Sequence, residues 1–559
     1  MITTRDLVSL KNLKGDVLGG LTTAIVSLPL ALAFGVASGA GAQAGLYGAV
    51  LVGFWAAFFG GTRTLISEPT GPMTLMMTTV LIKIAAIHPE HALPLGFTVV
   101  VLAGLFQILF GALKLGRYIT LMPYSVISGF MSGIGVLLVT LQIPSLLGHP
   151  TPPGGAPGVL AALPGLLDAV RWPEVILGSL ALLVLFILPA SWRKVVPPQL
   201  LVLVAGTLYA WAFFGTQSLR VIGDIPMGLP SFRWPVMSSD LIGMILVDAL
   251  LLAMLGCIDT LLTAMIADSL TRSQHDSDRE LIGQGIANTL SGLFGGLPGA
   301  GATMGTVVNI QSGAGTPRAA LIRALTLLGV ILVAAPLLSG VPMVILAAIT
   351  IKVGFDILDW SFLRRAHRVS WTATLIMYGV LLITVMADIM VAVGIGVFIA
   401  NIITIDRLSR LQASQIKTVD PTTDDSLQLS EEEKALLEKG RGNVVIFHLS
   451  GPMIFGVAKA IAREQAALQN AKVLIVDLRD VPMLATTVGL AIENVIRDAE
   501  AAGCLVIVAG AGPKICEQLS GLGLIGPEAH TLMADDRHAA LRLAVHSLEQ
   551  PVQEDYSVD

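Results

Sequence analysis

The sequence predicts a polytopic α-helical membrane protein that ends in a cytoplasmic α/β domain. The chain has 559 residues, of which 54% are hydrophobic and only 13% are charged. This composition is far too apolar for a soluble protein of such length. Apolar runs of roughly 18 to 25 residues recur from Asp16 to about Arg410, the length that a helix needs to cross a bilayer. After Arg410 the composition becomes that of a soluble protein.

Fourteen candidate membrane segments follow one another in the apolar region. They span about residues 16–37, 42–60, 70–86, 94–113, 122–147, 174–191, 198–215, 241–268, 281–296, 303–314, 318–338, 342–357, 371–388 and 390–406. Lys and Arg concentrate in the N-terminal tail, residues 1–15, and in alternate loops of the transmembrane domain, residues 16–410. By the positive-inside rule, the N-terminus and the region after Arg410 are cytoplasmic. We expect a multi-pass protein of the inner (plasma) membrane.

Two of these segments are short and follow breaks that are rich in Pro and Gly. The breaks lie at 67–74 and 298–303, and each precedes the third segment of a set of seven. A unit with an odd number of helices that is repeated once must be inverted relative to its copy, and paired broken helices point to a binding site at the membrane midplane. The alternative is that these residues only kink or closely pack helices. The matching positions favour two inverted seven-helix repeats with a site between them.

An acidic residue lies near the middle of the eighth segment. An ionised carboxylate in hydrocarbon costs several kcal/mol unless it faces a partner or a wet cavity, so Asp259 is a candidate functional residue. Thr263 follows four residues later, on the same face of a helix. Two oxygen ligands one turn apart suit a hard cation.

Four other acids in or near the membrane region have different expected roles. We interpret Glu68 as a cap at the cytoplasmic edge of a helix rather than as a substrate ligand. Asp248 lies near the same face as Asp259 but close to the outer end, and is a weaker candidate for the access path. Asp388 is expected at the outer surface, and Asp268 is expected to pair within a basic cytoplasmic loop.

Charge balance predicts that a cation takes part in binding. Helix N-termini at Thr70 and Thr303 would present N–H groups and positive dipole ends to an anion. We find no well-placed Arg or Lys in the predicted core, and all nine histidines fall outside the predicted membrane interior. An anion beside an ionised Asp259 would therefore place two negative charges together in a low dielectric. Sodium held by Asp259 and Thr263 would neutralise the carboxylate. A proton on Asp259 is the alternative, because burial favours the neutral form.

The region after Arg410 has the pattern of an α/β domain. Residues 411–440 are polar and acidic and are expected to be a linker that runs into a short helix, and residues 551–559 form a tail. Between them, the domain at 441–550 alternates the two periodicities of strands and helices. We expect strands at 444–449, 473–478 and 505–509, and helices at 457–470, 486–502, 514–522 and 537–549.

These features together resemble the sulfate permease (SulP) family of anion transporters, which carry a C-terminal STAS domain. Fourteen segments in two inverted halves, the Glu-Pro-Thr-Gly-Pro break at 68–72 and the terminal α/β domain carry the resemblance. Longer similar blocks lie at 31–41, 64–74, 255–259, 267–272, 299–306 and 449–459, and they are most similar to the sodium-dependent bicarbonate transporters of that family. The resemblance covers nearly the whole chain.

The resemblance implies a sodium and bicarbonate symporter. It implies a homodimer, with contact through the STAS domain, in which a core domain carries the substrate past a gate domain, as an elevator does. The implied sodium ligands are Asp259, Thr263, Gly301, Ala302 and Thr303. The implied anion-binding residues are Pro69, Thr70, Gly71, Ala302 and Thr303. No cofactor is expected besides Na⁺ as the coupling ion. A proton-coupled sulfate or dicarboxylate permease of the same family is the alternative.

Other function classes find little support in the sequence. No nucleophile triad, metal cluster or phosphate-binding loop is present, since no Lys follows the glycines at 299–306, so we do not expect an enzyme. The basic residues are spread over loops, so we expect no nucleic-acid partner. A channel, or a sensor with a vestigial membrane part, is disfavoured because the acid and both breaks are intact.

STAS domains of the anti-sigma-antagonist type carry a phosphorylated Ser in an Asp-Ser-(Ser/Thr)-Gly turn. The matching stretch here, 484–488, lacks both the Asp and the Gly. We therefore favour Thr486 and Thr487 as helix caps over a phosphorylation site.

Overall fold

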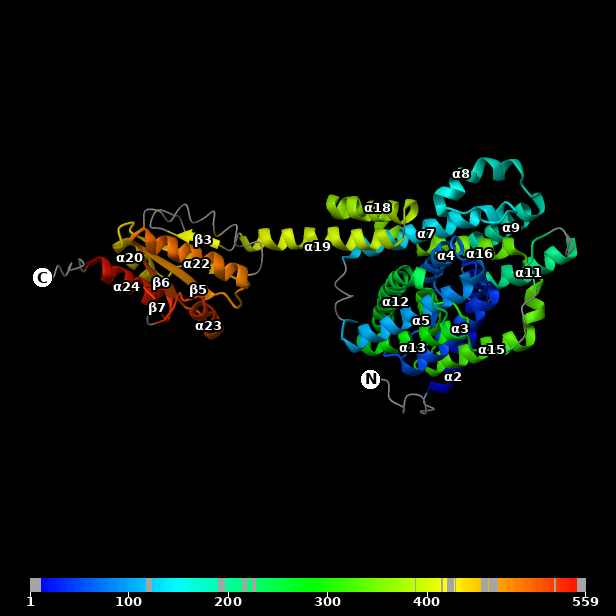
Figure 1. Ribbon diagram of the computed structural model, residues 1–559. Coiled ribbons are helices and arrows are strands. Elements are labelled where there is room, and N and C mark those ends of the chain that lie inside the picture. Colours follow the sequence, from blue (N-terminus) through cyan, green and yellow to red (C-terminus); the bar gives the residue numbers. More distant parts are fainter. Residues whose placement is uncertain are drawn as a thin grey trace. The chain divides into compact units, whose positions relative to one another are not determined.

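The computed structural model of the chain consists of two compact units, Met1–Phe398 and Ile399–Asp559. The structure describes residues 12–116, 123–189, 197–213, 219–223, 228–387, 389–413, 416–419, 427, 429–453, 461, 471–526 and 529–549. The first unit is helical, and the second is built on a five-stranded sheet (Figure 1).

A helix occupies each of the fourteen expected segments. In the first half these are α2 (Leu13–Ala37), α3 (Ala42–Phe59), α4 (Gly71–Ala85), α5 (Ala92–Ala112), α7 (Tyr124–Leu146), α9 (Trp172–Ile187) and α11 (Pro198–Phe213). In the second half they are α12 (Ile242–Thr271), α13 (Ser277–Leu293), α14 (Thr303–Gln311), α15 (Arg318–Ser339), α16 (Met343–Ile357), α18 (Trp371–Met386) and α19 (Ile389–Ala413). The boundaries follow the apolar runs closely, because each run ends where polar residues or a helix-breaking Gly or Pro begin.

The number of membrane crossings stays a prediction. Among the described residues, five helices are long and apolar enough to cross a membrane, and a bent pair, α8 (Gly155–Asp168) with α9, could form a sixth. The chain bends by 120° at the break between the two helices of this pair. The broken helix α4 and helices α11 and α18 are apolar but shorter.

The sequence patterns did not reveal α8, α17 (Trp360–Val369) or the short 3₁₀ helices η2 (Pro89–His91) and η3 (Ser239–Leu241). Helix α17 has no apolar run, because basic residues cover much of it. Its N-cap, Asp359, accepts a hydrogen bond from the Phe362 N–H, and Ser370 ends α17 while capping α18. Side-chain caps of this kind fix both boundaries.

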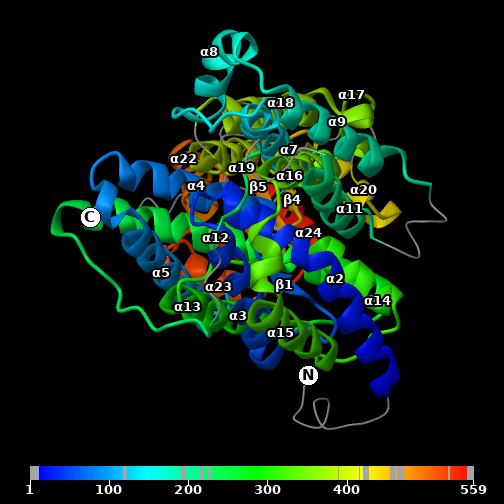
Figure 2. The ribbon, with the colours of Figure 1, turned by 90° about the vertical axis from the view of Figure 1, so that its right-hand side faces the viewer.

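The two predicted breaks meet in the middle of the first unit. Strand β1 (Ser67–Glu68) pairs antiparallel with β2 (Ala300–Gly301), with Ser67 opposite Gly301. Each strand leads into a helix, α4 after β1 and α14 after β2, so these helices leave the pair in opposite directions. This arrangement is the one that an inverted repeat requires. Contacts of β1 with α3, and of β2 with α12, hold the pair within the helices (Figure 2).

The helices around the break pack closely through glycines. Helix α13 packs against α5 and α3, and α15 packs against α2 and α3. A Cβ atom at Gly104 of α5 would lie 2.5 Å from the carbonyl oxygen of Gly285 in α13, so the two backbones are nearly in contact. Small residues allow this approach in membrane helices. A second group contains α7, which packs against α16 and α18, and α9, which packs against α16.

The second unit contains the sheet order β3-β4-β5-β6-β7, in which β3 is antiparallel to β4 and the other pairs are parallel. The strands are β3 (Ile416–Val419), β4 (Val444–Ser450), β5 (Val473–Asp480), β6 (Leu505–Ala509) and β7 (Leu532–Ala534). The helices are α20 (Glu431–Lys439), α22 (Thr486–Ala501), α23 (Pro513–Gly521) and α24 (Arg537–Glu549). The central strands carry buried apolar residues on both faces, as parallel strands covered by helices do.

Two features of this unit differ from expectation. Strand β3 lies within the segment that we expected to be a linker, and neither β3 nor β7 was predicted, because both are short. The predicted caps are also wrong: the N-cap of α22 is Ala485, and no side chain caps the first turn. Thr486 and Thr487 are therefore already inside the helix. The predicted helix at 457–470 lies, apart from residue 461, outside the described residues.

Candidate ion-binding site

Helix α12 presents the candidate acid to the break before α4. Asp259 is 7% exposed, and its Oδ2 accepts a hydrogen bond of 2.7 Å from the Thr70 hydroxyl. Thr70 is the N-cap of α4 and has the extended backbone that this position requires. Because its hydroxyl donates to Asp259, Thr70 does not cap its own helix. The structure therefore joins the predicted sodium ligand to the predicted anion residue directly.

One turn further along α12, two threonines hold the other break. The Thr263 hydroxyl donates to the Gly301 carbonyl oxygen at 2.9 Å, and the same hydroxyl lies 2.9 Å from the Thr303 hydroxyl. The Gly301 N–H donates to Thr260 Oγ1 at 3.1 Å. A Cβ atom at Gly301 would lie only 3.1 Å from Thr260 Cα and from Thr263 Cβ. Glycine is therefore the residue that lets the strand lie this close to α12.

The predicted sodium ligands offer a set of hard oxygen atoms. The carboxylate of Asp259 contacts the first break at Thr70, and the Thr263 hydroxyl one turn further along α12 contacts the Gly301 carbonyl and the Thr303 hydroxyl of the second break. Oxygen ligands of this kind suit a small hard cation. The Thr263 hydroxyl already lies within hydrogen-bonding distance of both the Gly301 carbonyl oxygen and the Thr303 hydroxyl.

The first turns of α4 and α14 have no side-chain cap. Thr70 uses its hydroxyl elsewhere, and Ala302, the N-cap of α14, has no polar side chain. First-turn N–H groups and the positive end of the helix dipole favour an anion at such a position.

The other predicted anion residues contribute less directly. The Ala302 N–H donates to the Ile66 carbonyl oxygen at 2.7 Å, so this N–H is already used within the protein. Pro69 has no N–H and is buried. Gly71 packs tightly, because an added Cβ would lie 2.8 Å from Ile357 and 2.9 Å from Leu138.

A cation does lie in the core, and this corrects the sequence analysis. Arg323 of α15 is fully buried, and its guanidinium binds the carboxylate of Glu68 at 2.5 Å. It also donates to Ser27 Oγ and to the carbonyl oxygens of Ala49 and Ser67. Glu68 is therefore neither a helix cap nor a cytoplasmic edge residue. It is a buried member of β1 that pairs with Arg323.

The ion pair leaves Asp259 without a charged partner among the described residues. Arg323 and Glu68 together carry no net charge, whereas Asp259 receives its hydrogen bond from Thr70. The charge of Asp259 is therefore not balanced by Arg323.

Polar residues of α13 hold the second break and were also missed. Gln284 and Asn288 both donate to the Gly299 carbonyl oxygen at 2.9 Å, and Asn288 Oδ1 accepts from the Gly299 N–H. Two amide side chains four residues apart in an apolar segment lie on one helix face, and this spacing is the signal that would have found them. The sequence gives no comparable signal for Thr260, because a single Thr is common in apolar helices.

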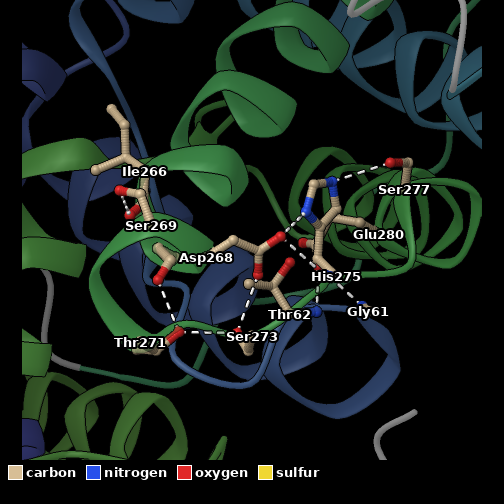
Figure 3. A network of polar contacts seen from close by, with 11 residues as sticks. Gly61, Thr62, Ile266, Asp268, Ser269, Thr271, Ser273, His275, Ser277 and Glu280 are labelled. Carbon is tan, nitrogen blue, oxygen red and sulfur yellow. Dashed lines mark hydrogen bonds and ion pairs between the residues drawn. The ribbon is translucent and has the colours of Figure 1, made fainter.

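The remaining acids lie away from the break. Asp248 is buried, with the Lys83 ammonium 3.6 Å from its carboxylate, so its surroundings are those of an ion pair. Asp268 pairs in the loop after α12, as predicted: its Oδ2 lies 2.6 Å from His275 Nδ1 (Figure 3). In the same region Glu280 accepts hydrogen bonds from the N–H groups of Gly61 and Thr62. Asp388 lies outside the described residues.

A cavity in the first unit reaches the first turn of α14. It has a volume of about 640 Å³ and is lined by residues of α2, α9, α11, α14 and α16, among them Met304 and Val308. Met304 directly follows Thr303, and both are exposed. The cavity therefore lies between the helices that hold the breaks and the second packing group.

Comparison with known proteins assigns the chain to a family. Residues 13–380 match the sulfate permease family, and residues 436–527 match the STAS domain. The chain belongs to the sulfate permease family. Its membrane unit and its terminal α/β unit are thus the two parts that the family resemblance predicted.

Named relatives and solved structures agree with this assignment. The chain is 53% identical to the bicarbonate transporter BicA of Synechocystis sp. over 548 residues, which cover 98% of this chain and 97% of that protein. The solved transmembrane domain of a cyanobacterial bicarbonate transporter BicA matches with 56% identity and a TM-score of 0.66, and covers 68% of this chain and 98% of that one. Murine Slc26a9, an anion transporter solved in the inward-facing state, shares the fold at 18% identity with a TM-score of 0.82, over 97% of this chain and 93% of that one.

Proposed function

We propose that the protein carries bicarbonate across the membrane together with sodium. One observation carries the proposal: the buried carboxylate of Asp259 contacts the start of α4, Thr263 one turn further along α12 contacts the start of α14, and no side chain caps either helix. An acid and an anion site so close together need a cation between them. The bicarbonate substrate is supported by the identity to BicA, which extends over nearly the full length of both chains.

Sodium would take oxygen ligands from Asp259, Thr263, Thr303 and the Gly301 carbonyl. Once sodium neutralises the carboxylate, the repulsion between Asp259 and an anion at the helix starts disappears. Binding of each ion then raises the affinity for the other, and coupling of this kind amounts to about 1–3 kcal/mol in other proteins. Thr70 would serve both ions, since its hydroxyl contacts Asp259 and its backbone begins α4.

Transport would follow an elevator mechanism. The helices that hold the breaks form one packing group, and α7, α9, α16 and α18 form another. The cavity beside Met304 lies between the two groups on one side. A second cavity, of about 660 Å³, lies between the outer parts of α2, α4 and α7. Sliding of the first group along the second would expose the site to each side in turn.

The proposal includes the assembly and the location. We infer a homodimer that forms contacts through the STAS domain, in the inner (plasma) membrane, with the N-terminus and the STAS domain in the cytoplasm. Clustering of Lys and Arg in alternate loops supports this orientation.

Uptake of labelled bicarbonate into liposomes that contain the full chain tests the proposal. Uptake should require an inward sodium gradient, ignore excess sulfate and be lost in Asp259→Asn. Asp268→Asn is the matched control, because it removes a carboxylate from the same helix at the His275 loop and should transport normally. Uptake that ignores sodium, follows a proton gradient and is blocked by sulfate would replace the proposal with a proton-coupled sulfate permease.

The sodium ligands can be tested separately from the substrate. Thr263→Val removes one oxygen and should raise the sodium concentration for half-maximal uptake, whereas Thr263→Ser keeps the hydroxyl and should stay near wild type. An equal effect of both variants would show that Thr263 acts through packing rather than through its oxygen.

A further inference from the structure

Helix α17 is a short basic helix held between two apolar helices. It follows α16 after only Leu358 and Asp359, and Ser370 alone separates it from α18. Both neighbours belong to the apolar first unit, and the connections are too short for α17 to move away from the surface of that unit. A helix in this position must lie where α16 and α18 meet the boundary of the apolar layer.

One face of α17 is fixed against the protein. Asp359 Oδ2 accepts hydrogen bonds of 2.7 Å from the Tyr124 and Ser128 hydroxyls of α7. The Phe362 ring packs edge-on against Tyr124 with 5.2 Å between ring centres, and Ala366 is fully buried. These contacts fix the rotation of the helix, and therefore determine which side chains face outward.

The outward face carries a dense positive charge. Arg364, Arg365, His367 and Arg368 are all exposed, and α17 contains no acidic residue. Within the described residues, none of the three arginines forms an ion pair with a carboxylate; Arg365 bonds to Ser361 of its own helix. Arg318 at the start of α15 shows the usual alternative, since it pairs with Asp16 at 2.9 Å. Three arginines without an ion pair among the described residues, on a helix of ten residues, make this face strongly attractive to anions.

Exposed aromatic side chains lie at both ends of this face. Trp360 is 45% exposed and stacks with the Arg364 guanidinium 6.0 Å from the ring centre, and Trp371 is 69% exposed. Indole rings are enriched at the boundary between hydrocarbon and headgroups, where amphipathic rings lie at the level of the headgroups. A soluble acidic partner would not require them.

We propose that the basic face of α17 binds the headgroups of anionic phospholipids. The guanidinium groups would bind lipid phosphates in the bidentate manner that arginine allows, and the two tryptophans would lie at the level of the headgroups. An acidic protein segment is the other class of occupant that this charge would attract, and the exposed tryptophans at the ends of the helix favour the lipid surface over it.

Native mass spectrometry of the full-length protein tests this proposal by counting retained phosphatidylglycerol against phosphatidylcholine from an equimolar mixture. We expect wild type to prefer phosphatidylglycerol, and the triple variant Arg364→Gln/Arg365→Gln/Arg368→Gln to lose apparent affinity at least about tenfold. The corresponding triple Lys variant should keep most of the preference, which excludes misfolding as the cause.

A second triple variant controls for total charge. Arg441→Gln/Arg497→Gln/Arg542→Gln removes the same charge from exposed positions of the second unit and should bind lipid as wild type does. Equal retention of phosphatidylglycerol by wild type and the α17 glutamine variant would overturn the proposal.

Discussion

Asp259 in the membrane unit and Asp477 in the STAS domain are both buried carboxylates, but their surroundings are opposite. Asp477 Oδ2 receives hydrogen bonds from His448 at 2.9 Å and from Arg537 at 2.7 Å, and Oδ1 accepts from the Arg479 N–H at 3.2 Å. Asp259, within the described residues, receives one hydrogen bond, from the neutral hydroxyl of Thr70. The Arg537 guanidinium balances the charge of Asp477, which is typical of a structural carboxylate, whereas the single neutral donor to Asp259 leaves its charge unbalanced, as the proposed cation site requires.

Glu68 extends this contrast within the membrane unit. It is as deeply buried as Asp259 and lies on the strand that leads to Thr70, yet Arg323 neutralises it. Two acids near one break therefore have different roles. Glu68 and Arg323 pair with each other at β1, whereas Asp259 has no charged partner among the described residues and is the proposed cation ligand.

If the Glu68–Arg323 pair is structural, its disruption should have the largest effect on stability. Arg323→Met leaves the Glu68 charge buried without its partner and should lower the free energy of unfolding by about 3–5 kcal/mol. Thermal unfolding of the purified protein in detergent measures the loss. The double variant Arg323→Met/Glu68→Gln should recover much of it, because no charge then remains unpaired. A single variant as stable as wild type would contradict a structural role.

Loss of the one donor to Asp259 should weaken ion binding more than folding. Thr70→Val removes a hydrogen bond to a charged group, an interaction that contributes about 1.5–3 kcal/mol, and should raise the half-saturating sodium concentration by roughly 10- to 100-fold. Sodium-dependent uptake gives this value, and Thr70→Ser is the matched control that keeps the hydroxyl. Unchanged sodium affinity in Thr70→Val would separate Thr70 from the cation site.

The charged partners of Asp477 predict a pH dependence that is confined to the STAS domain. Burial alone would raise the pKa of Asp477, but the His448 hydrogen bond and the Arg537 guanidinium outweigh it and hold the pKa below its usual range. The resulting stabilisation is complete above the unfolded pKa, about 3.9, and is lost as the pH falls through the lower folded value.

Hydrogen exchange of the β4 and β5 amides in the full chain measures this effect. Wild type should be better protected than Asp477→Asn at about pH 6, and the difference should narrow towards about pH 3.5. A difference that stays constant over this range would show that the carboxylate charge does not stabilise the sheet.

The smallest effect is expected where a sequence-based prediction was wrong. Because Thr486 caps nothing, Thr486→Ala should change the free energy of unfolding of the STAS domain by less than about 0.5 kcal/mol. Ser430→Ala provides the comparison, since Ser430 and Glu433 form a reciprocal capping box at α20, and its loss should cost about 1 kcal/mol. Local hydrogen exchange in α22 and α20 reports both changes. A larger effect at Thr486 would point to a role outside helix capping.

The sequence by itself determined the helices, the two breaks and the central acid. Apolar runs set the helix boundaries, because polar side chains and helix-breaking Gly and Pro end them where the environment changes. The breaks were visible because Pro and Gly at matching positions interrupt two such runs. Asp259 was visible because an acid in an apolar run is energetically costly, and therefore indicates a functional or structural role. These signals are local, and each can be read within one turn or one segment.

Only the tertiary structure decided which residues meet. The pairing of Ser67 with Gly301, and the contact of Thr70 with Asp259, join residues more than 180 positions apart in the sequence. Arg323 was overlooked because a single Arg in an apolar segment does not reveal its partner, and Glu68 was misplaced for the same reason. Whether a buried charged residue forms a structural ion pair or an ion site depends on the groups that contact it. Those groups are distant in the sequence and come together only in the folded chain.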